Sequence, residues 1–380
     1  MSTAPTRPTL PLDKTARLVA RALRTTPDEL AASFRPATLD DLPQILALRA
    51  QTVGEDIGWD DQAYMLWRYS FGRPGCGAGN CWVLVREGAL LGMVGTENLS
   101  LSLAGEHTKG FRVMDILIQP DLEGKGVGAW LLLMMKSQAP VVLAVGSNPS
   151  SKRLVTRVFD ALPNRRIFIH PIRFDHFMAK RLKLAPLGWL ASRLADWGMR
   201  AATAWLLWGG RRGVAVRKLN VLPDGLDTLL AAAARPDRVE VQRGRAHLDW
   251  RLSTPRARFD IWGAWKHGEL VGLMITRPDA IDEGRQAWMV MDVMLNERLK
   301  EPVLKALLWR VLSQAYRQGA DYITVVSYRQ DIERHLLRAG FVEQYNEYRI
   351  MAWACTNDRL RAAVEAGADW SFNEIHGDGG

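Results

Sequence analysis

A chain of 380 residues is too long for a single compact core and suits two domains with some connecting structure. Hydrophobic residues make up 48% of it and charged residues 24%, values typical of a folded chain, which argues against disorder beyond the ends. The formal net charge of +9 is moderate and scattered, so it allows an anionic ligand or surface without requiring nucleic acid.

Cysteine usage and the hydropathy of the sequence argue against further classes of protein. Cys76, Cys81 and Cys355 form no CxxC pair and lie near no histidine cluster, which argues against a disulfide framework or a zinc site, and no metal is expected. The first residues lack the apolar run of a secretion signal, and no run of 18 uncharged apolar residues indicates a membrane span. We therefore expect a cytoplasmic protein, and association with a membrane surface stays open.

In chain order, residues 1–33 predict a helical extension with a short amphipathic helix over 15–24. From residue 34, apolar runs such as CWVLV, ALLGMVGTE and RVMDILI predict strands, and Glu87-Gly88 predicts a hairpin turn. A helix over 127–137 and the strand VVLAVGS follow, which completes a βαβ crossover. The predicted fold class is α/β with a mixed (α+β) sheet.

The same pattern occurs a second time along the chain. The segment Ala63–Arg68 resembles 246–251, Trp82–Gly92 resembles 262–272, and Val113–Ile116 resembles 290–293, in the same order and at nearly constant spacing. Such self-similarity indicates two copies of one supersecondary module. It predicts one domain over 34–172 and a second, diverged domain over 219–354.

Between the copies, residues 173–218 predict a tryptophan-rich helical linker. Its apolar side chains recur at steps of three and four: Leu187, Leu190, Leu194, Trp197, Ala201, Ala204, Trp205 and Trp208. Arg193, Asp196 and Arg200 fall on the opposite face. Two interpretations stay open: a helix packed across both domains, which we favour, or peripheral membrane contact through 187–208. Residues 355–380 predict a final helix and a polar tail.

The segment Gly124–Gly128, between the strand RVMDILI and the following helix, carries the chemistry. A helix start leaves backbone N–H groups unpaired and partly positive, and glycines let the backbone approach a ligand closely. Lys125 adds positive charge, so this turn suits a pyrophosphate. Neither the GxxxxGK[ST] nor the GxGxxG pattern fits, because no Ser or Thr follows Lys125 and no glycine stands at 130 or 131.

Here the sequence resembles the GNAT acyltransferase superfamily. The stretch Ile118–Gly128 fits the family's loop motif with Glu123 in place of Arg or Gln. The opening stretch Phe34–Leu42 is similar to the family's first strand and helix, and Val145–Pro149 to its fifth strand and the asparagine after it. The resemblance implies two tandem GNAT-like domains joined by the helical linker.

The resemblance also implies an acyl-CoA co-substrate, acetyl-CoA or another acyl-CoA. Loop amides would hold its pyrophosphate, and the preceding strand would pair with the pantetheine arm and polarise the acyl carbonyl. The cofactor-binding residues implied are Ile116, Leu117, Ile118, Gly124, Lys125, Gly126, Val127, Gly128 and Asn148. The second copy has no glycine over 291–302, so we expect no cofactor there.

Two carboxylates are candidate catalytic residues. Asp115 lies just before the loop and could act as a general base, or it could pair with Arg68, as Asp292 could with Arg251. Glu97 could face the same site, or it could be a solvated strand end. Many relatives carry a tyrosine acid where Val155 stands in this sequence.

The leading hypothesis is transfer of an acyl group, acetyl above all, from acyl-CoA to an amine of a small molecule or sugar. One alternative is a non-catalytic acyl-CoA-binding or scaffold protein. Another is an aminoacyl or long-chain N-acyltransferase acting near membranes. We expect a small-molecule acceptor and no nucleic acid, while the acceptor's identity, the acyl length and the oligomeric state stay open.

Overall fold

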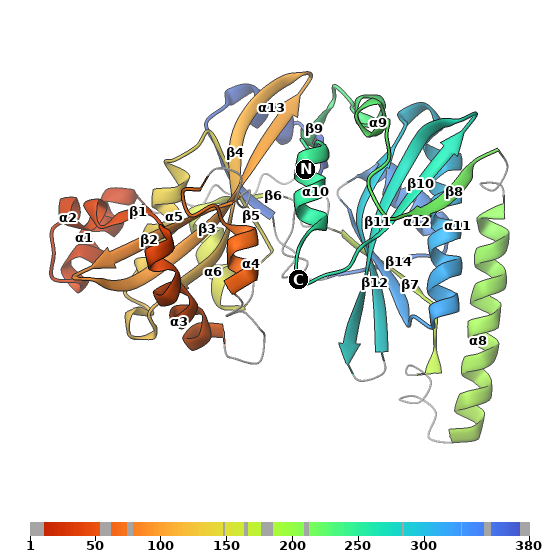
Figure 1. Cartoon of the computed structure of the whole chain (residues 1–380), viewed down its shortest axis with the longest axis horizontal. Coiled ribbons are helices and arrows are strands. Elements are labelled where there is room, and N and C mark those ends of the chain that lie inside the picture. Colours follow the sequence, from red (N-terminus) through yellow and green to blue (C-terminus); the bar gives the residue numbers. More distant parts are fainter. Residues whose placement is uncertain are drawn as a thin grey trace. The chain divides into compact units, whose positions relative to one another are not determined.

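The computed structural model describes residues 11–53, 62–73, 79–146, 149–162, 166–175, 185–208, 213–282, 285–327, 329–345 and 351–372. They form two compact units (Figure 1). Unit 1 takes residues 1–164, 254–256 and 347–368. Unit 2 takes residues 165–253, 257–346 and 369–380.

Unit 1 is built on a mixed sheet whose strands lie in the order β1-β2-β3-β4-β5-β15-β6. Within this order β4 and β5 run parallel, and the helix α5 joins them. The strands are β1 Phe34–Pro36, β2 Gly79–Arg86, β3 Ala89–Leu103, β4 Glu106–Ile118, β5 Val141–Val145, β6 Asp160–Leu162 and β15 Met351–Cys355. The helices are α1 Leu12–Ala22, α2 Pro27–Ala32, α3 Leu42–Val53, α4 Gln62–Arg68, α5 Val127–Lys136, α6 Pro149–Val158 and α13 Asp358–Glu365.

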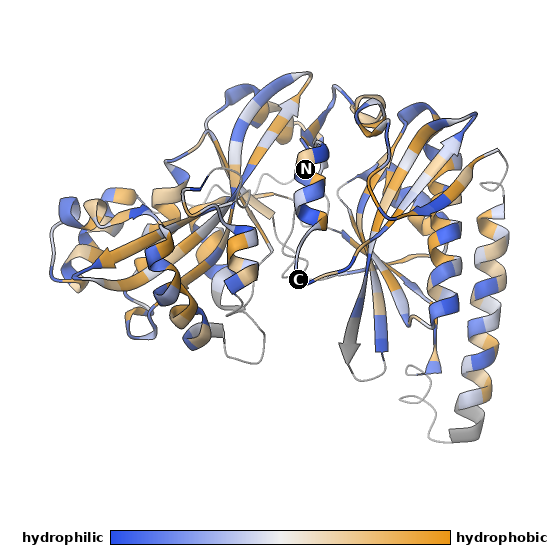
Figure 2. Cartoon of the chain, viewed as in Figure 1, coloured by the Kyte–Doolittle hydropathy of each residue, from blue (hydrophilic) through white to orange (hydrophobic). Residues whose placement is uncertain are grey.

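Helices line this sheet because its strands are apolar, as Figure 2 shows. One buried cluster joins α5 to the N-terminal helices α1 and α2, with Trp130 packed edge-on against Phe34 at 5.6 Å between ring centroids. A second cluster joins α3 and α4 to β2, β3 and β4. The expected helix over 15–24 is thus observed over 12–22, and it contributes Val19 and Ala20 to the core.

Unit 2 has a sheet of the order β14-β7-β13-β12-β11-β10-β8, in which β12 and β13 run parallel and α11 joins them. Its strands are β7 Arg166–Pro171, β8 Ala215–Leu219, β10 Asp260–Lys266, β11 Glu269–Asp282, β12 Arg285–Leu295, β13 Tyr322–Ser327 and β14 Val342–Gln344, and β9 Arg238–Val241 pairs with β16 Asp369–Ser371. Its helices are α8 Ala185–Leu206, α9 Leu226–Ala233, α10 Arg245–Leu252, α11 Lys300–Gln318 and α12 Gln330–Arg338.

The predicted hairpins and crossovers are confirmed in both units. Glu87-Gly88 joins β2 to β3, and His267-Gly268 joins β10 to β11, each with both residues at positive φ. This turn matches the twist of the strands it connects. A further tight turn at Ala104-Gly105 extends β3 and β4 well beyond the expected strands.

Two strands lie in the other unit from the one that the predicted domain limits 34–172 and 219–354 give them. β7 lies between β13 and β14 in unit 2, whereas β15 lies between β5 and β6 in unit 1. Both are short apolar strands, RIFIHP and MAWAC, that hydrogen-bond through the backbone. Their sequences therefore predict strands without indicating which sheet each completes.

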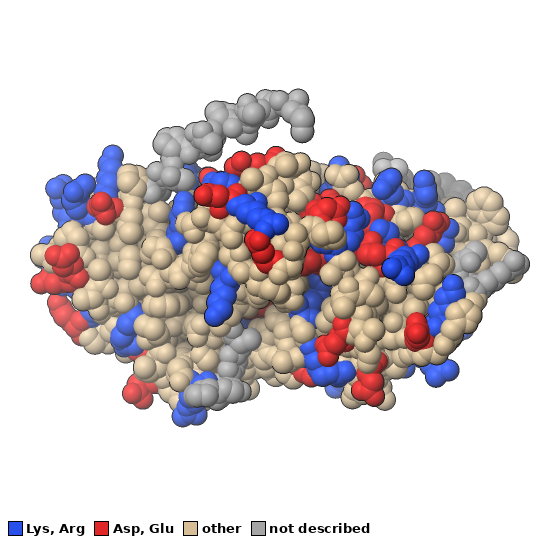
Figure 3. Space-filling view, turned by 90° about the horizontal axis from the view of Figure 1, so that it is seen from above, with Lys and Arg blue, Asp and Glu red and all other residues tan. Residues whose placement is uncertain are grey.

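Charge and hydropathy at the surface agree with the composition. On the face drawn in Figure 3, basic and acidic side chains are interspersed rather than gathered into one field of a single sign. Within the described residues, every helix is too short or too polar to cross a bilayer.

His170 in β7 gives unit 2 a pH-dependent stability. The ring is fully buried, and its Nε2 lies 3.2 Å from Thr203 Oγ1 and 3.3 Å from Tyr316 Oη. Burial lowers its pKa from 6.5 to about 4. Because the folded pKa is depressed, the neutral ring stabilises the fold above pH 6.5, and this stabilisation is lost as the pH falls toward 4.

We expect His170→Gln to remove this dependence. Between pH 7.5 and pH 4.5 the unfolding free energy of the unmodified protein should fall by about 2 kcal/mol more than that of the variant. Urea unfolding followed by circular dichroism at both pH values measures the difference. Parallel losses in the two proteins would contradict it.

Candidate functional site

The central feature of unit 1 is a bulge in β4. Asp115 has φ +49°, in the left-handed region that non-glycine residues rarely adopt, and the register with β3 shifts between Met93 and Gly95. Pairing of β4 with β5 runs from Gly110–Val141 to Val113–Ala144, before the bulge. β4 continues to Ile118, so β5 leaves the backbone edge of Ile116–Ile118 unpaired.

Buried charges surround Asp115 and hold the bulge. Tyr69 Oη donates a hydrogen bond to Asp115 Oδ2 at 2.5 Å. The guanidinium nitrogens Arg49 Nη1 and Arg68 Nε each lie 3.3 Å from the same oxygen. All of these side chains are buried, and a Cβ on Gly95 would lie 1.9 Å from Tyr69 Oη, so only glycine fits there. The predicted pairing of Arg68 with Asp115 is confirmed.

Glu97 has a different position from the predicted strand end. It lies in the middle of β3, is fully buried, and accepts a hydrogen bond from Arg112 Nη2 on β4 at 2.8 Å. The strand continues because Ala104-Gly105 closes a long hairpin that the sequence pattern did not indicate. The expectation of a solvated strand end is therefore wrong.

The loop after β4 ends in a helix start with open backbone donors. Pro120–Leu122 form a 3₁₀ turn, and Gly124 and Gly126 follow with φ +76° and +87°. Gly126 is the N-cap of α5 and supplies no side-chain cap. The amides of Gly126, Val127 and Gly128 come too early in the helix to bond a carbonyl four residues back. A helix start without a side-chain cap favours an anion. Gly126 is half-buried beside Val19 of α1, and Val127 and Gly128 are buried.

Most of the sequence-predicted binding residues meet at this junction. Ile116, Leu117 and Ile118 form the open edge of β4, and Gly124–Gly128 follow at the start of α5. Glu123, which departs from the family pattern, is exposed, as is Lys125. Asn148 lies outside the described residues. Val155 on α6 is buried in the core.

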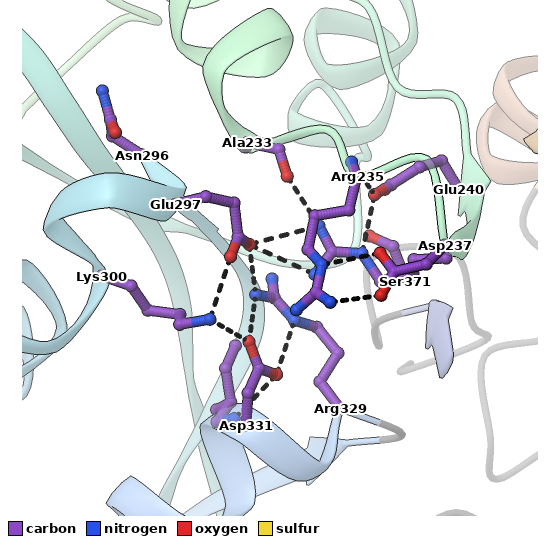
Figure 4. A network of polar contacts seen from close by, with 12 residues as sticks. Ala233, Arg235, Asp237, Glu240, Asn296, Glu297, Lys300, Arg329, Asp331 and Ser371 are labelled. Carbon is purple, nitrogen blue, oxygen red and sulfur yellow. Dashed lines mark hydrogen bonds and ion pairs between the residues drawn. The ribbon is translucent and has the colours of Figure 1, made fainter. Parts of the chain in front are cut away.

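In unit 2 the corresponding junction is occupied by its own side chains (Figure 4). Only Asn296–Leu299 separate β12 from α11. Glu297 Oε1 accepts from Arg329 Nη2 at 3.0 Å and Glu297 Oε2 from Lys300 Nζ at 2.9 Å. Asp331, at the start of α12, accepts from Lys300 Nζ at 2.6 Å.

Glu297 lies in the turn before α11, the crossover helix of unit 2, and Asp331 lies at the start of α12. Asp331 Oδ1 accepts from the amide of Ile332 at 2.9 Å. Burial opposes the ionisation of Asp331, but Arg329 and Lys300 outweigh it and hold its pKa well below the usual range. Arg238, almost fully buried, adds a third cation 3.3 Å from Glu297. A diphosphate there would meet two fixed negative charges.

Sequence reasoning missed Arg49 and Tyr69 as parts of the Asp115 cluster. Arg49 belongs to the helix α3, among the buried Leu42, Ile45 and Leu48. A cation within such an apolar stripe indicates a buried partner, and this was the available signal. Asp292 also has a partner that the sequence did not indicate, since Arg243 Nε lies 2.9 Å from Asp292 Oδ2.

Comparison with known proteins finds solved structures of similar fold. No family model matches the sequence, and no curated protein matches it. The structure is similar to a GCN5-related N-acetyltransferase from Anabaena variabilis ATCC 29413, with a TM-score of 0.58 and 11% identity over 86% of this chain and 73% of that one.

Two further solved structures are similar. One is a probable N-acyltransferase from Enterococcus faecalis V583, with a TM-score of 0.55 and 9% identity over 85% of this chain and 71% of that one. The other is N-myristoyltransferase from Saccharomyces cerevisiae with bound myristoyl-CoA, with a TM-score of 0.50 and 12% identity over 84% and 78%. At these identities the likeness shows the fold: two GNAT-like domains in one chain.

The Asp115 cluster predicts a pair of variants with different effects. Asp115→Asn leaves two buried guanidiniums short of a counter-charge, and the unfolding free energy should fall by an amount on the order of 3 kcal/mol. Because the bulge shapes the edge of β4, affinity for coenzyme A should also fall by about tenfold or more, a loss on the order of 1.4 kcal/mol.

Asp292→Asn is the matched control. It removes a buried carboxylate paired with Arg243 in unit 2, so it should destabilise the protein and leave coenzyme A affinity unchanged. Urea unfolding and calorimetric titration, at a temperature where both variants are folded, give the two readouts. Equal losses of affinity in the two variants would count against a special role for the Asp115 bulge.

Proposed function

From the GNAT fold and the junction in unit 1, we propose that this protein is an acyl-CoA-dependent N-acyltransferase. It transfers an acyl group, acetyl in the first instance, to an amine of a small molecule or sugar. The observation that carries the proposal is the combination, in one unit, of an open β4 edge and an uncapped helix start. The open edge of β4 suits an extended chain that contains amides, and the uncapped helix start suits a diphosphate.

In this proposal the backbone does the binding. The amides of Gly126, Val127 and Gly128 hold the diphosphate of acyl-CoA. The edge over Ile116–Ile118 pairs with the pantetheine arm and directs an N–H at the thioester carbonyl. A donor aimed at the oxygen where negative charge develops stabilises the transition state more than the ground state.

The reaction requires one new bond and one broken bond. The acceptor's neutral amine attacks the thioester carbonyl carbon, the N–C bond forms, and the C–S bond breaks. One proton leaves the nitrogen, and the sulfur departs as coenzyme A thiol. Since Asp115 and Glu97 are each ion-paired with guanidinium groups, neither is well placed to accept that proton. We propose that Asp115 positions β4 and that the amine loses its proton to solvent.

A non-catalytic acyl-CoA-binding protein is the second candidate. It is favoured by the ion pairing of both carboxylates and by the sequence PSSKRLVTRV of α6, which offers no tyrosine acid. Both candidates predict binding of coenzyme A, and only the enzyme predicts turnover. Binding and turnover are measured in separate experiments.

Coenzyme A should raise the thermal midpoint of the protein, because a ligand that binds only the folded state stabilises it. Gly126→Val should abolish the shift, since a β-branched residue at φ +87° displaces the amides of the α5 start. Gly105→Val is the matched control: its φ is +83°, with open space around it, in the β3–β4 turn. A shift lost equally in both variants, or absent from the unmodified protein, would contradict the site.

Turnover is measured as free thiol released from acetyl-CoA and from longer acyl-CoAs with a panel of amines. We expect amine-dependent release that rises with pH as the amine loses its proton, and loss of this release in Gly126→Val. Coenzyme A binding without amine-dependent thiol release from any donor would favour the non-catalytic candidate.

A further inference from the structure

The helix α8 in unit 2 exposes its apolar side chains. Six large ones, five on α8 and Trp208 just after it, are between 51% and 78% exposed: Trp189, Leu190, Leu194, Trp197, Trp205 and Trp208. We call these six residues the α8 stripe. Figure 2 shows hydrophobic and hydrophilic residues alternating along this helix. Such a stripe indicates an interaction site, because single exposed apolar residues are common on protein surfaces whereas contiguous apolar patches are not.

The opposite face of α8 is the one that packs on unit 2. Ser192 and Thr203 of α8, and Leu207 just after it, are each 1% exposed. Thr203 Oγ1 lies 3.2 Å from His170 Nε2, and Asp196 Oδ1 accepts from the amide of Phe174 at 2.8 Å. These contacts of α8 lie within unit 2, and the α8 stripe is exposed.

The charges beside the α8 stripe are positive. Between 189 and 208, the exposed charged side chains of α8 are Arg193 and Arg200, and the helix's carboxylate, Asp196, is half-buried. The Arg193 guanidinium lies 5.7 Å from the centre of the Trp189 ring.

A hollow of about 440 Å³ lies at the C-terminal end of the α8 stripe. Trp205 forms one side of it, and Lys305, His335 and Arg338 supply its polar lining. Lys305 is paired with Glu301 at 2.7 Å, so the cationic lining is partly neutralised. Arg338 is exposed. The hollow therefore offers a tryptophan and basic groups together.

We propose that α8 docks unit 2 on an anionic phospholipid surface. The tryptophans and leucines enter the interfacial layer, where amphipathic rings are favoured, and the arginines meet the headgroup phosphates. The hollow beside Trp205 faces the headgroups. A second copy of the chain is a poorer occupant, since a symmetric contact through this face would bring Arg193 and Arg200 against like charges.

Vesicle co-sedimentation tests the proposal without any acyl-CoA. The unmodified protein should bind vesicles with about one-third phosphatidylglycerol and should bind pure phosphatidylcholine about tenfold more weakly, with the difference shrinking at high salt. On binding, tryptophan emission should shift to shorter wavelength. Trp197→Ser with Trp205→Ser should weaken binding to both vesicles by about tenfold.

Two further proteins separate the contributions. Arg193→Gln with Arg338→Gln should reduce the preference for anionic vesicles while leaving the weaker binding to phosphatidylcholine. Tyr345→Ser, at an aromatic side chain that is 80% exposed outside α8, is the matched control and should bind as the unmodified protein does. All variants alter exposed side chains, and circular dichroism checks their folding.

Three outcomes would overturn the proposal. One is no binding of the unmodified protein to either vesicle. Another is binding that the tryptophan double variant retains in full. The third is a dimer in sedimentation velocity that the same double variant dissolves, which would assign the α8 stripe to a second copy of the chain.

Discussion

The contact between the Asp115 carboxylate and its buried partners determines the geometry of unit 1. A left-handed conformation at a non-glycine residue costs free energy, and it persists here because Arg49, Arg68 and Tyr69 all converge on one carboxylate oxygen. The bulge that results follows the last paired residues of β4 and β5. The pairing proposed for the pantetheine arm depends on the strand edge beyond that point.

The two units show how one scaffold can carry different junctions. Both have a hairpin, a bulged strand, a crossover helix and a parallel strand. In unit 1 a glycine loop leads into α5 and leaves backbone amides open at its start. In unit 2 a shorter loop brings Glu297 to Lys300 and Arg329, so that a carboxylate lies in the turn before the crossover helix. Side-chain charge, more than backbone path, distinguishes them.

Local sequence signals predicted the local structure well. The two-residue turns, the strand periodicity and the crossover helices each depend on neighbouring residues, and they are found where the patterns placed them. The glycine spacing also predicted a junction between a strand and a helix, and most of the predicted binding residues lie at that junction. Arg68 was paired with Asp115 correctly because the same residues recur in the second half of the sequence.

What the sequence did not predict depends on contacts between distant segments. Nothing local in RIFIHP or MAWAC states which sheet it joins, so the placement of β7 and β15 was missed. The hydropathy of α8 indicated an apolar face without indicating that Ser192 and Thr203 would be the buried ones. The sequence pattern placed Glu97 at a strand end, because its partner Arg112 lies on the next strand, across a turn that the pattern did not indicate.

Amide hydrogen exchange with and without coenzyme A tests the central claim most directly. The account predicts new protection at two places only, the β4 edge over Ile116–Ile118 and the α5 start over Gly126–Gly128, because those amides gain a ligand. Protection confined to the start of α11 near Lys300, or none in either unit, would contradict it.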